Sequence, residues 1–205
     1  MADSKEPQMA RHIFTADLHL GHANIIRHCS RPFANVDEMD RTMIDNWNEV
    51  VQPSDTVWML GDFAHNRADP RTLRRLFSQL RGSKHLIAGN HDGKAVRELG
   101  WSSVRDYAEI SVEGKRVVLS HYSMRSWNAM RYGAIQLYGH SHGGLPGTAQ
   151  CLDVGVDAWD FRPVTFPEIQ ARLATLPALS SDFDGPKGLL EVEGTEAESH
   201  LGLAV

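Results

Sequence analysis

Residues 56–62 read Thr-Val-Trp-Met-Leu-Gly-Asp, and the pattern of this short stretch recurs along the chain. Its first five residues are largely apolar and do not alternate with polar ones, which is typical of a strand covered on both faces of a parallel sheet. Glycine and an acid follow at once. Because ligands of open α/β sheets bind just beyond the carboxyl ends of strands, Asp62 is predicted to lie at a binding edge.

Four further apolar runs end in residues that could bind a ligand. The runs cover residues 12–16, 84–88, 115–120 and 134–138. They lead into Asp17-Leu18-His19, Gly89-Asn90-His91-Asp92, His121 and Gly139-His140-Ser141-His142. Asp17 and His19 are two residues apart, as are His140 and His142, which puts each pair on one side of a strand or on a turn beyond it. The strand ends therefore predict one site of carboxylate, amide and imidazole donors.

The stretches between these runs favour an α/β fold. A helical spacing of apolar residues covers 37–51, with Asp37 as a plausible N-cap. A second helix is predicted over 70–80, with proline in its first turn. Further on, strands over 104–112 and 115–120 flank a short glycine-containing turn and predict a hairpin.

Length and composition indicate one domain. The chain has 205 residues, of which 41% are hydrophobic, enough for a sizeable core. We expect the domain over 11–179, with flexible termini at 1–10 and 180–205. Only two cysteines are present, and we find neither an apolar secretion signal nor a run of about 18 apolar residues. A cytoplasmic protein without a membrane partner is the expectation.

Charge narrows the class of partner. The 21 basic and 26 acidic side chains give a net charge of -5, which argues against a nucleic-acid backbone or an anionic membrane. A small phosphate ester, including a nucleotide held by metal ions, is compatible with this charge.

The donor types indicate the metals that would suit the site. Mixed oxygen and imidazole donors suit Mn²⁺, Fe, Zn²⁺, Co²⁺ or Ni²⁺, whereas Mg²⁺ and Ca²⁺ prefer oxygen alone. The candidate donors are Asp17, His19, Asp62, Asn90, His121, His140 and His142. Seven are too many for one tetrahedral ion, but two ions bridged by a carboxylate would use them all. Such a pair, roughly 3.5–4 Å apart, clamps the attacking and leaving oxygens at phosphorus and acidifies a shared water.

The motifs Asp-x-His, Gly-Asp, Gly-Asn-His-Asp, a lone His and Gly-His-x-His, in this order, resemble those of the calcineurin-like metallophosphoesterase superfamily over residues 13 to about 165. The runs Phe14-Thr15-Ala16-Asp17, Asn46-Trp47-Asn48 and Leu60-Gly61-Asp62-Phe63 are most similar to its small stand-alone bacterial and phage phosphoesterases. The resemblance implies two stacked mixed β-sheets flanked by helices, in a four-layer α/β/β/α arrangement. It also implies a hydrolase with two divalent transition metal ions, Mn²⁺ first among them.

The resemblance assigns a role to each matching residue. One ion would be held by Asp17, His19, Asp62 and His142. The other would be held by Asp62, Asn90, His121 and His140, so that Asp62 bridges and a metal-bridging hydroxide attacks. His91 matches the histidine that faces the substrate and steadies or protonates the leaving oxygen.

One segment departs from the family pattern. Many members continue Gly-Asp-x-x-Asp-Arg, but this chain has His65 and Asn66 at the last two positions. That puts a preference for phosphomonoesters in doubt and favours phosphodiesters or cyclic nucleotides. Two alternatives stay open. One is a non-catalytic scaffold on the same fold, like the retromer subunit of this architecture, and the other is a nuclease using the same metals.

Several other residues have two interpretations. Asp92 is predicted to be a turn residue or to orient a ligand. Met39, Trp47 and Trp58 occupy core-like positions, while Trp127 could stack on a nucleobase or simply pack. Five side chains near the motifs could line a substrate pocket or be ordinary surface groups: His22, His28, Arg31, His65 and Arg125.

Overall fold

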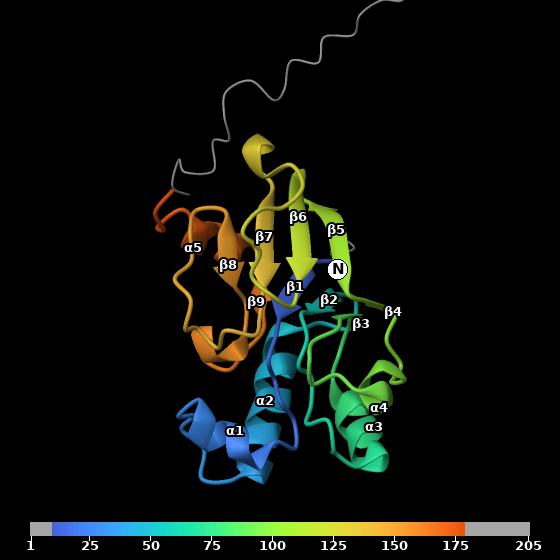
Figure 1. The fold of residues 1–205 in the computed structure, drawn as a ribbon. Coiled ribbons are helices and arrows are strands. Elements are labelled where there is room, and N and C mark those ends of the chain that lie inside the picture. Colours follow the sequence, from blue (N-terminus) through green and yellow to red (C-terminus); the bar gives the residue numbers. More distant parts are fainter. Residues whose placement is uncertain (1–9, 179–205) are drawn as a thin grey trace, which may run out of the picture.

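Two stacked β-sheets form the centre of the structure, a computed structural model that describes residues 10–178 (Figure 1). The first sheet has the order β4-β3-β2-β1-β9, with β1 His12–Thr15, β2 Thr56–Met59, β3 Ser83–Ile87, β4 Ser103–Arg105 and β9 Val164–Thr165. The second has the order β5-β6-β7-β8, with β5 Tyr107–Val112, β6 Lys115–Ser120, β7 Ile135–Tyr138 and β8 Cys151–Asp153. Both sheets are mixed, because β9 runs antiparallel to β1 and β5 to β6. The predicted pair of mixed sheets flanked by helices is confirmed.

The described range leaves the predicted chain ends untested. The expected flexible termini, 1–10 and 180–205, lie outside it except for residue 10, so they and the limits of the domain stay predictions. Within residues 10–178, none of the helices has both the length and the apolar character that crossing a bilayer requires.

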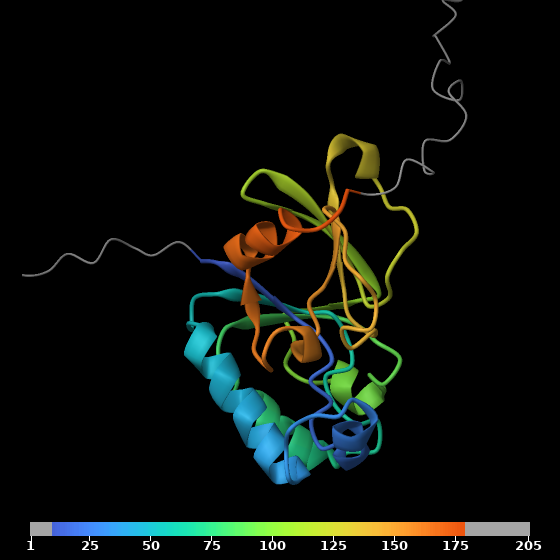
Figure 2. The same ribbon diagram turned by 90° about the vertical axis from the view of Figure 1, so that its left-hand side faces the viewer.

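Four helices cover the outer face of the first sheet (Figure 2): α1 Ala23–His28, α2 Val36–Val50, α3 Pro70–Gln79 and α4 Lys94–Arg97. The N-cap of α2 is Asn35, whose side chain accepts a hydrogen bond from the N–H of Glu38. Asp37, the predicted N-cap, lies instead in the first turn, where its charge favours the helix dipole. Helix α3 begins at Pro70, as predicted.

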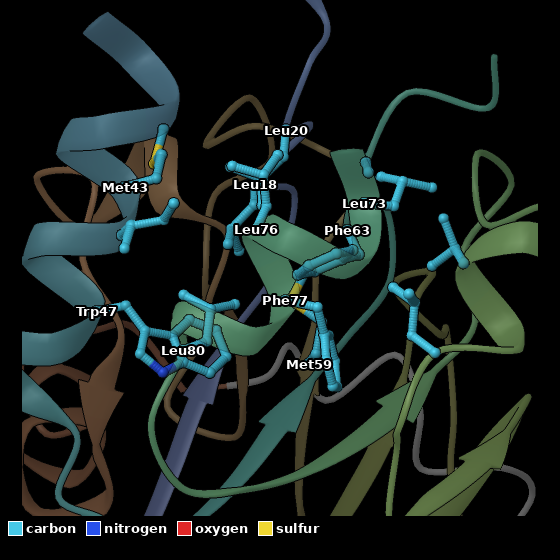
Figure 3. Packing of buried hydrophobic residues seen from close by; sticks show 14 of the residues in the cluster. Leu18, Leu20, Met43, Trp47, Met59, Phe63, Leu73, Leu76, Phe77 and Leu80 are labelled. Carbon is cyan, nitrogen blue, oxygen red and sulfur yellow. The ribbon is translucent and has the colours of Figure 1, made fainter. Parts of the chain in front are cut away.

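The first hydrophobic core lies between these helices and the first sheet (Figure 3). Trp47 of α2 is fully buried, and its indole N–H donates to the carbonyl oxygen of Arg81 at 3.0 Å. Leu73 and Phe77 of α3 belong to the same cluster. Each large side chain buried in this way contributes about 1.5–3 kcal/mol to stability. The core positions predicted for Met39 and Trp47 are confirmed.

A second core fills the space between the two sheets and explains why β2 does not alternate. Val57 and Met59 pack in the first core, whereas Trp58 and Leu60 pack in the second. Both faces of β2 are therefore apolar. Helix α5, Phe166–Leu173, contributes three buried side chains to the second core and so flanks the sheets from another side.

The predicted strand 104–112 is divided between the two sheets. Its first part is β4, which ends at Arg105 and pairs with β3. Its second part is β5, which begins at Tyr107 and pairs with β6. One continuous strand was therefore a wrong prediction, because the apolar pattern does not show where a chain changes sheets. The predicted turn at Glu113 and Gly114 is present.

Trp127 packs in the fold and does not face a ligand. It lies against the outer face of the second sheet, in a buried cluster with Val118 and Tyr138. Its indole N–H donates to the carbonyl oxygen of Ala134 at 2.9 Å. The packing interpretation is confirmed, and stacking on a nucleobase is excluded by the burial of the ring.

Helix α5 starts with a capping box that should make stability depend on acid. Glu168 accepts hydrogen bonds from Arg162 and from the hydroxyl and N–H of Thr165. Burial acts to raise the pKa of Glu168, but these hydrogen bonds outweigh it and lower the pKa to about 2. In the unfolded chain the pKa is about 4.3. The stabilisation is therefore complete above that value and is lost as the pH falls towards 2.

We expect Glu168→Gln to remove this acid dependence. The difference in unfolding free energy between the wild type and the variant should be largest near pH 6 and shrink steadily below about pH 4.3. Urea unfolding at a series of pH values measures this difference. A difference that stays constant down to pH 3 would contradict the assignment.

Candidate metal centre

Loops at the carboxyl ends of the strands are tied together where the two sheets meet. The N–H of Asp17 donates to the carbonyl oxygen of Gly61 at 3.0 Å, which joins the ends of β1 and β2. The N–H of Gly139 donates to the carbonyl oxygen of His121 at 3.0 Å, which joins the ends of β6 and β7. The N–H of His140 donates to Oδ2 of Asp17 at 2.8 Å and connects the second sheet to the first. These bonds bring residues from both sheets into one site.

Many of the predicted ligands have an unusual backbone conformation. Positive φ angles occur at Asp17 (59°), His19 (53°), Asp62 (55°), His140 (67°) and His142 (48°). Such angles are uncommon outside glycine and cost of order 1–3 kcal/mol each. Strain of this kind persists where the surrounding structure enforces it, and it clusters at functional sites.

Two glycines make room for the donors. A Cβ at Gly61, where φ is +90°, would lie 2.3 Å from Nδ1 of His121. A Cβ at Gly89 would lie 2.3 Å from Oδ1 of Asp62. Both distances are far below van der Waals contact, so the glycines before Asp62 and Asn90 are required by the close approach of the loops.

The first donor group consists of Asp17, His19 and His142, with one atom from each within 4.8 Å of the others. Oδ1 of Asp17 and Nε2 of His19 are buried and have no hydrogen-bond partner among residues 10–178. Burial, with Asp153 and Asp62 nearby, raises the pKa of Asp17 well above its usual range. Burial also lowers the pKa of His19 to about 2, so its imidazole is neutral.

Buried polar atoms without a hydrogen-bond partner destabilise the folded state unless another group interacts with them. A divalent cation would do so, since it accepts both a carboxylate oxygen and a neutral imidazole nitrogen as ligands. The residues present therefore fit a metal ion.

The second donor group consists of Asp62, His121 and His140. Nδ1 of His121 lies 2.8 Å from the carbonyl oxygen of Leu60, and a proton on Nδ1 leaves Nε2 free to face the group. That Nε2 lies 3.1 Å from Oδ1 of Asn90, so the amide also belongs to this group.

Asp62 lies between the two groups. Its Oδ2 is 3.6 Å from Nε2 of His19 on one side and 3.5 Å from Nε2 of His121 on the other. Its Oδ1 accepts a hydrogen bond from the N–H of His91 at 2.8 Å. Burial opposes ionisation of Asp62, but the neighbouring His121 and the hydrogen bond from that N–H lower its pKa to about 2. The other six predicted donors thus lie together around the ionised, buried carboxylate of Asp62.

Comparison with known proteins agrees with this geometry. Residues 11–148, more than half of the chain, match the family model for the calcineurin-like phosphoesterase superfamily domain. The chain belongs to this superfamily. It is therefore a phosphoester hydrolase, and its donor groups fit the divalent metals on which such phosphoesterases depend.

Individual relatives of this phosphoesterase come from archaea, phages and bacteria. The chain is 32% identical to the uncharacterized protein MJ1445 of Methanocaldococcus jannaschii, over 73% of this chain and 84% of that protein. It is 31% identical to the gene 66 protein of Mycobacterium phage D29, over 71% of this chain and 87% of that one. The crystal structure of AQ665 from Aquifex aeolicus, a protein of unknown function, shares the fold. Its TM-score is 0.64 at 24% identity, over 80% of this chain and 99% of that one.

The phosphoesterase holds His142 in place through a buried ion pair that sequence reasoning missed. Nδ1 of His142 lies 2.7 Å from Oδ2 of Asp157. Arg31 donates two hydrogen bonds of 2.8 Å to Asp157 and a third of 2.7 Å to the carbonyl oxygen of Asp17. Arg31 is therefore buried beneath the site and is not one of its surface residues. Asp157 directly follows the apolar run 151–156, for which the sequence predicts a strand, and this position could have drawn attention to it. In the structure β8 ends at Asp153 and Asp157 lies in the short 3-10 helix Val156–Ala158.

Asp92 ties two ligand loops together. Its carboxylate accepts hydrogen bonds from the N–H groups of Asp62, Phe63 and Gly89, at 2.8, 2.9 and 2.8 Å. The side chain is buried and fixes the position of Asp62 relative to the loop that carries Asn90. This agrees with the orienting role predicted for Asp92.

The remaining predicted residues lie at different places around the centre. The ring of His91 is 5.1 Å from that of His19, and its buried Nδ1 has no hydrogen-bond partner within the described range. His22 lies beside His19, whereas His28 is exposed on α1.

Tyr122 was not predicted. It is 51% exposed and its ring packs edge-on against the rings of the two candidate ligands next to it. Its position directly after His121 could have drawn attention to it.

Proposed function

We propose that this phosphoesterase hydrolyses phosphodiesters, with cyclic nucleotides among the candidate substrates, at two divalent transition metal ions that share Asp62. The observation that carries the proposal is the position of Oδ2 of Asp62, 3.6 Å from Nε2 of His19 and 3.5 Å from Nε2 of His121. One oxygen lying so evenly between two imidazole nitrogens has the arrangement expected of a bridging carboxylate.

The two ligand sets follow from the donor groups. One ion would be held by Asp17, His19, Asp62 and His142, and the other by Asp62, Asn90, His121 and His140. Sets that mix imidazole nitrogens with carboxylate and amide oxygens suit Mn²⁺, Fe, Zn²⁺, Co²⁺ or Ni²⁺. Among these ions, the family resemblance puts Mn²⁺ first. When bound, the ions would supply Lewis acidity to the phosphoryl oxygens and to the attacking water.

His91 is the chain's own candidate for proton transfer. Its backbone is fixed by the bond from its N–H to Asp62, so the imidazole is held beside the centre. Its Nδ1 has no partner among residues 10–178 to compete for its proton. In this role His91 donates a proton to the leaving oxygen as the ester bond breaks, which typically contributes 10²–10⁴-fold to the rate.

The preference for diesters rests on which cations can reach the phosphate. A phosphomonoester carries more negative charge than a diester, and planar arginine forks are the side chains that bind phosphate oxygens best. Arg31, the arginine beneath the centre, is fully engaged with Asp157 and with backbone carbonyls. At the position where many family members have an arginine, this chain has Asn66. Both observations favour the less charged substrate.

A parallel assay tests the proposal. The protein is stripped with a chelator, reconstituted with Mn²⁺, Ni²⁺ or Zn²⁺, and assayed with p-nitrophenyl phosphate and bis(p-nitrophenyl) phosphate. We expect activity only with added metal and a higher kcat/KM for the diester. Hydrolysis of the monoester alone would overturn the diester preference. Metal binding without hydrolysis of either ester would favour the scaffold, and cleavage of single- or double-stranded DNA would favour the nuclease.

A further inference from the structure

A chain of imidazole rings extends from the candidate centre towards the protein surface. Nδ1 of His22 lies 3.3 Å from Nδ1 of His19. On its other sides, the ring of His22 is 4.5 Å from the ring of His65 and 5.9 Å from that of His91. His22, His65 and His91 are all half-buried, so the chain leads from a buried donor to the surface.

The short contact between His19 and His22 fixes where the protons lie. Nε2 of His19 is the buried atom that faces Asp62, so a cation would take that nitrogen. A neutral imidazole carries one proton, which must then be on Nδ1 of His19. This N–H can only donate to Nδ1 of His22, whose own proton is consequently on Nε2. Within residues 10–178, the hydrogen-bond contact of the His22 ring is the one through Nδ1, so its Nε2–H is available to donate.

His22 differs in this respect from the groups that hold the other histidines. His121 uses a backbone carbonyl and His142 uses Asp157, and neither acceptor has an N–H to offer a substrate. An imidazole that accepts through Nδ1, by contrast, carries its own proton on Nε2. That N–H lies on the opposite side of the ring, where it can donate to a substrate. His65, at a position where many family members have an aspartate, packs its ring against His22 and limits the rotation of that ring.

We propose that His22 both positions His19 and contacts the substrate. Its Nδ1 accepts the proton of His19, and its Nε2–H donates a hydrogen bond to a phosphoryl oxygen of the phosphodiester, next to the leaving oxygen that His91 serves. His65 keeps the ring of His22 in the required orientation. The substrate contact rests on the proposed function, whereas the contact with His19 does not.

Two substitutions separate the two roles of His22. In His22→Asn the side-chain oxygen can replace Nδ1 as the acceptor for His19, but nothing replaces the Nε2 donor. In His22→Gln the amide N–H can replace the Nε2 donor, while the acceptor for His19 is lost. His85→Asn is the matched control, because His85 is also half-buried, bonded through Nδ1 to a side chain and stacked on an aromatic ring, but in β3 against Trp58.

Each variant has its own expected readout. Calorimetric titration of the stripped protein with Mn²⁺ should show affinity for the ion at His19 weakened by about 10- to 100-fold in His22→Gln and nearly unchanged in His22→Asn. Kinetics with bis(p-nitrophenyl) phosphate at saturating Mn²⁺ should show KM raised about tenfold or more in His22→Asn, with a smaller change in kcat. His85→Asn should change neither quantity.

The outcomes also separate this inference from the proposed function. Equal behaviour of the Asn and Gln variants in both measurements would overturn it, because His22 would then serve only to fill space. An unchanged KM in His22→Asn would overturn the substrate contact. If the wild type does not hydrolyse the diester, the proposed function fails, but the Mn²⁺ titration of His22→Gln still tests the contact with His19.

Discussion

Replacing Asp62 with asparagine should abolish hydrolysis while leaving the fold intact. The amide has the shape of the carboxylate, and its oxygen can still accept the hydrogen bond from the N–H of His91. The negative charge between His19 and His121 is lost, however, and with it the group that would balance two cations. We expect the loss in kcat/KM to exceed the roughly 10–100-fold that is typical when a residue merely orienting a metal ligand is changed.

The test needs metal content and stability as well as rate. The variant should be stripped and reconstituted with Mn²⁺ before assay, and its bound metal measured by elemental analysis. Asp55→Asn is a matched control, since Asp55 is a buried carboxylate near the opposite end of β2 and forms an ion pair of 2.6 Å with Arg11. That control should lower the unfolding temperature without changing kcat. Near-normal activity of reconstituted Asp62→Asn would overturn the bridging role.

His91→Ala should lower kcat by about 10²–10⁴, the usual effect of losing a general acid. The metal content should stay the same, because the two ligand sets are complete without this residue. The loss should be greatest for a diester with an alkoxide leaving group, which needs a proton. It should be smaller for bis(p-nitrophenyl) phosphate, whose leaving group departs without one.

The distances allow His91 to be either a general acid or a metal ligand, and the dependence on the leaving group distinguishes the two roles. A donor atom of His91 lies within 4.8 Å of donor atoms from His19 and Asp62, close enough for His91 to bind a metal itself. If His91→Ala loses metal, and the rate falls equally for good and poor leaving groups, His91 is a ligand and not the acid.

The grouping of the candidate donors could be predicted from the sequence because these residues follow strands with a clear apolar signature. The run 56–60 has no polar alternation since β2 is packed on both faces, and that burial is also what places Asp62 at a sheet edge. The same reasoning located Asn90, His121 and His140. Burial of the strand on both faces thus explains both its apolar sequence and the position of the donor that follows it.

Other features depend on contacts that only the folded structure determines, so no local sequence pattern indicates them. Arg31 and Asp157 are 126 residues apart and meet only because the two sheets stack. The break at Asp106 depends on strand pairing with two different sheets. The N-cap of α2 was misplaced because Asn35 and Asp37 are both good capping residues, and only the bond to Glu38 decides between them.

The hydrogen bond from His140 to Asp17 has a consequence for the whole molecule. It joins the end of β7 to the end of β1, so the donors of the centre also form part of the seam between the two sheets. Any ion bound there would link the two sheets. Because only the folded state offers this site, binding of the ion would increase the free energy of unfolding. Loss of the ion would then loosen the two halves of the sandwich from each other at this edge. The free energy of unfolding of this protein would therefore increase with the concentration of free metal ion.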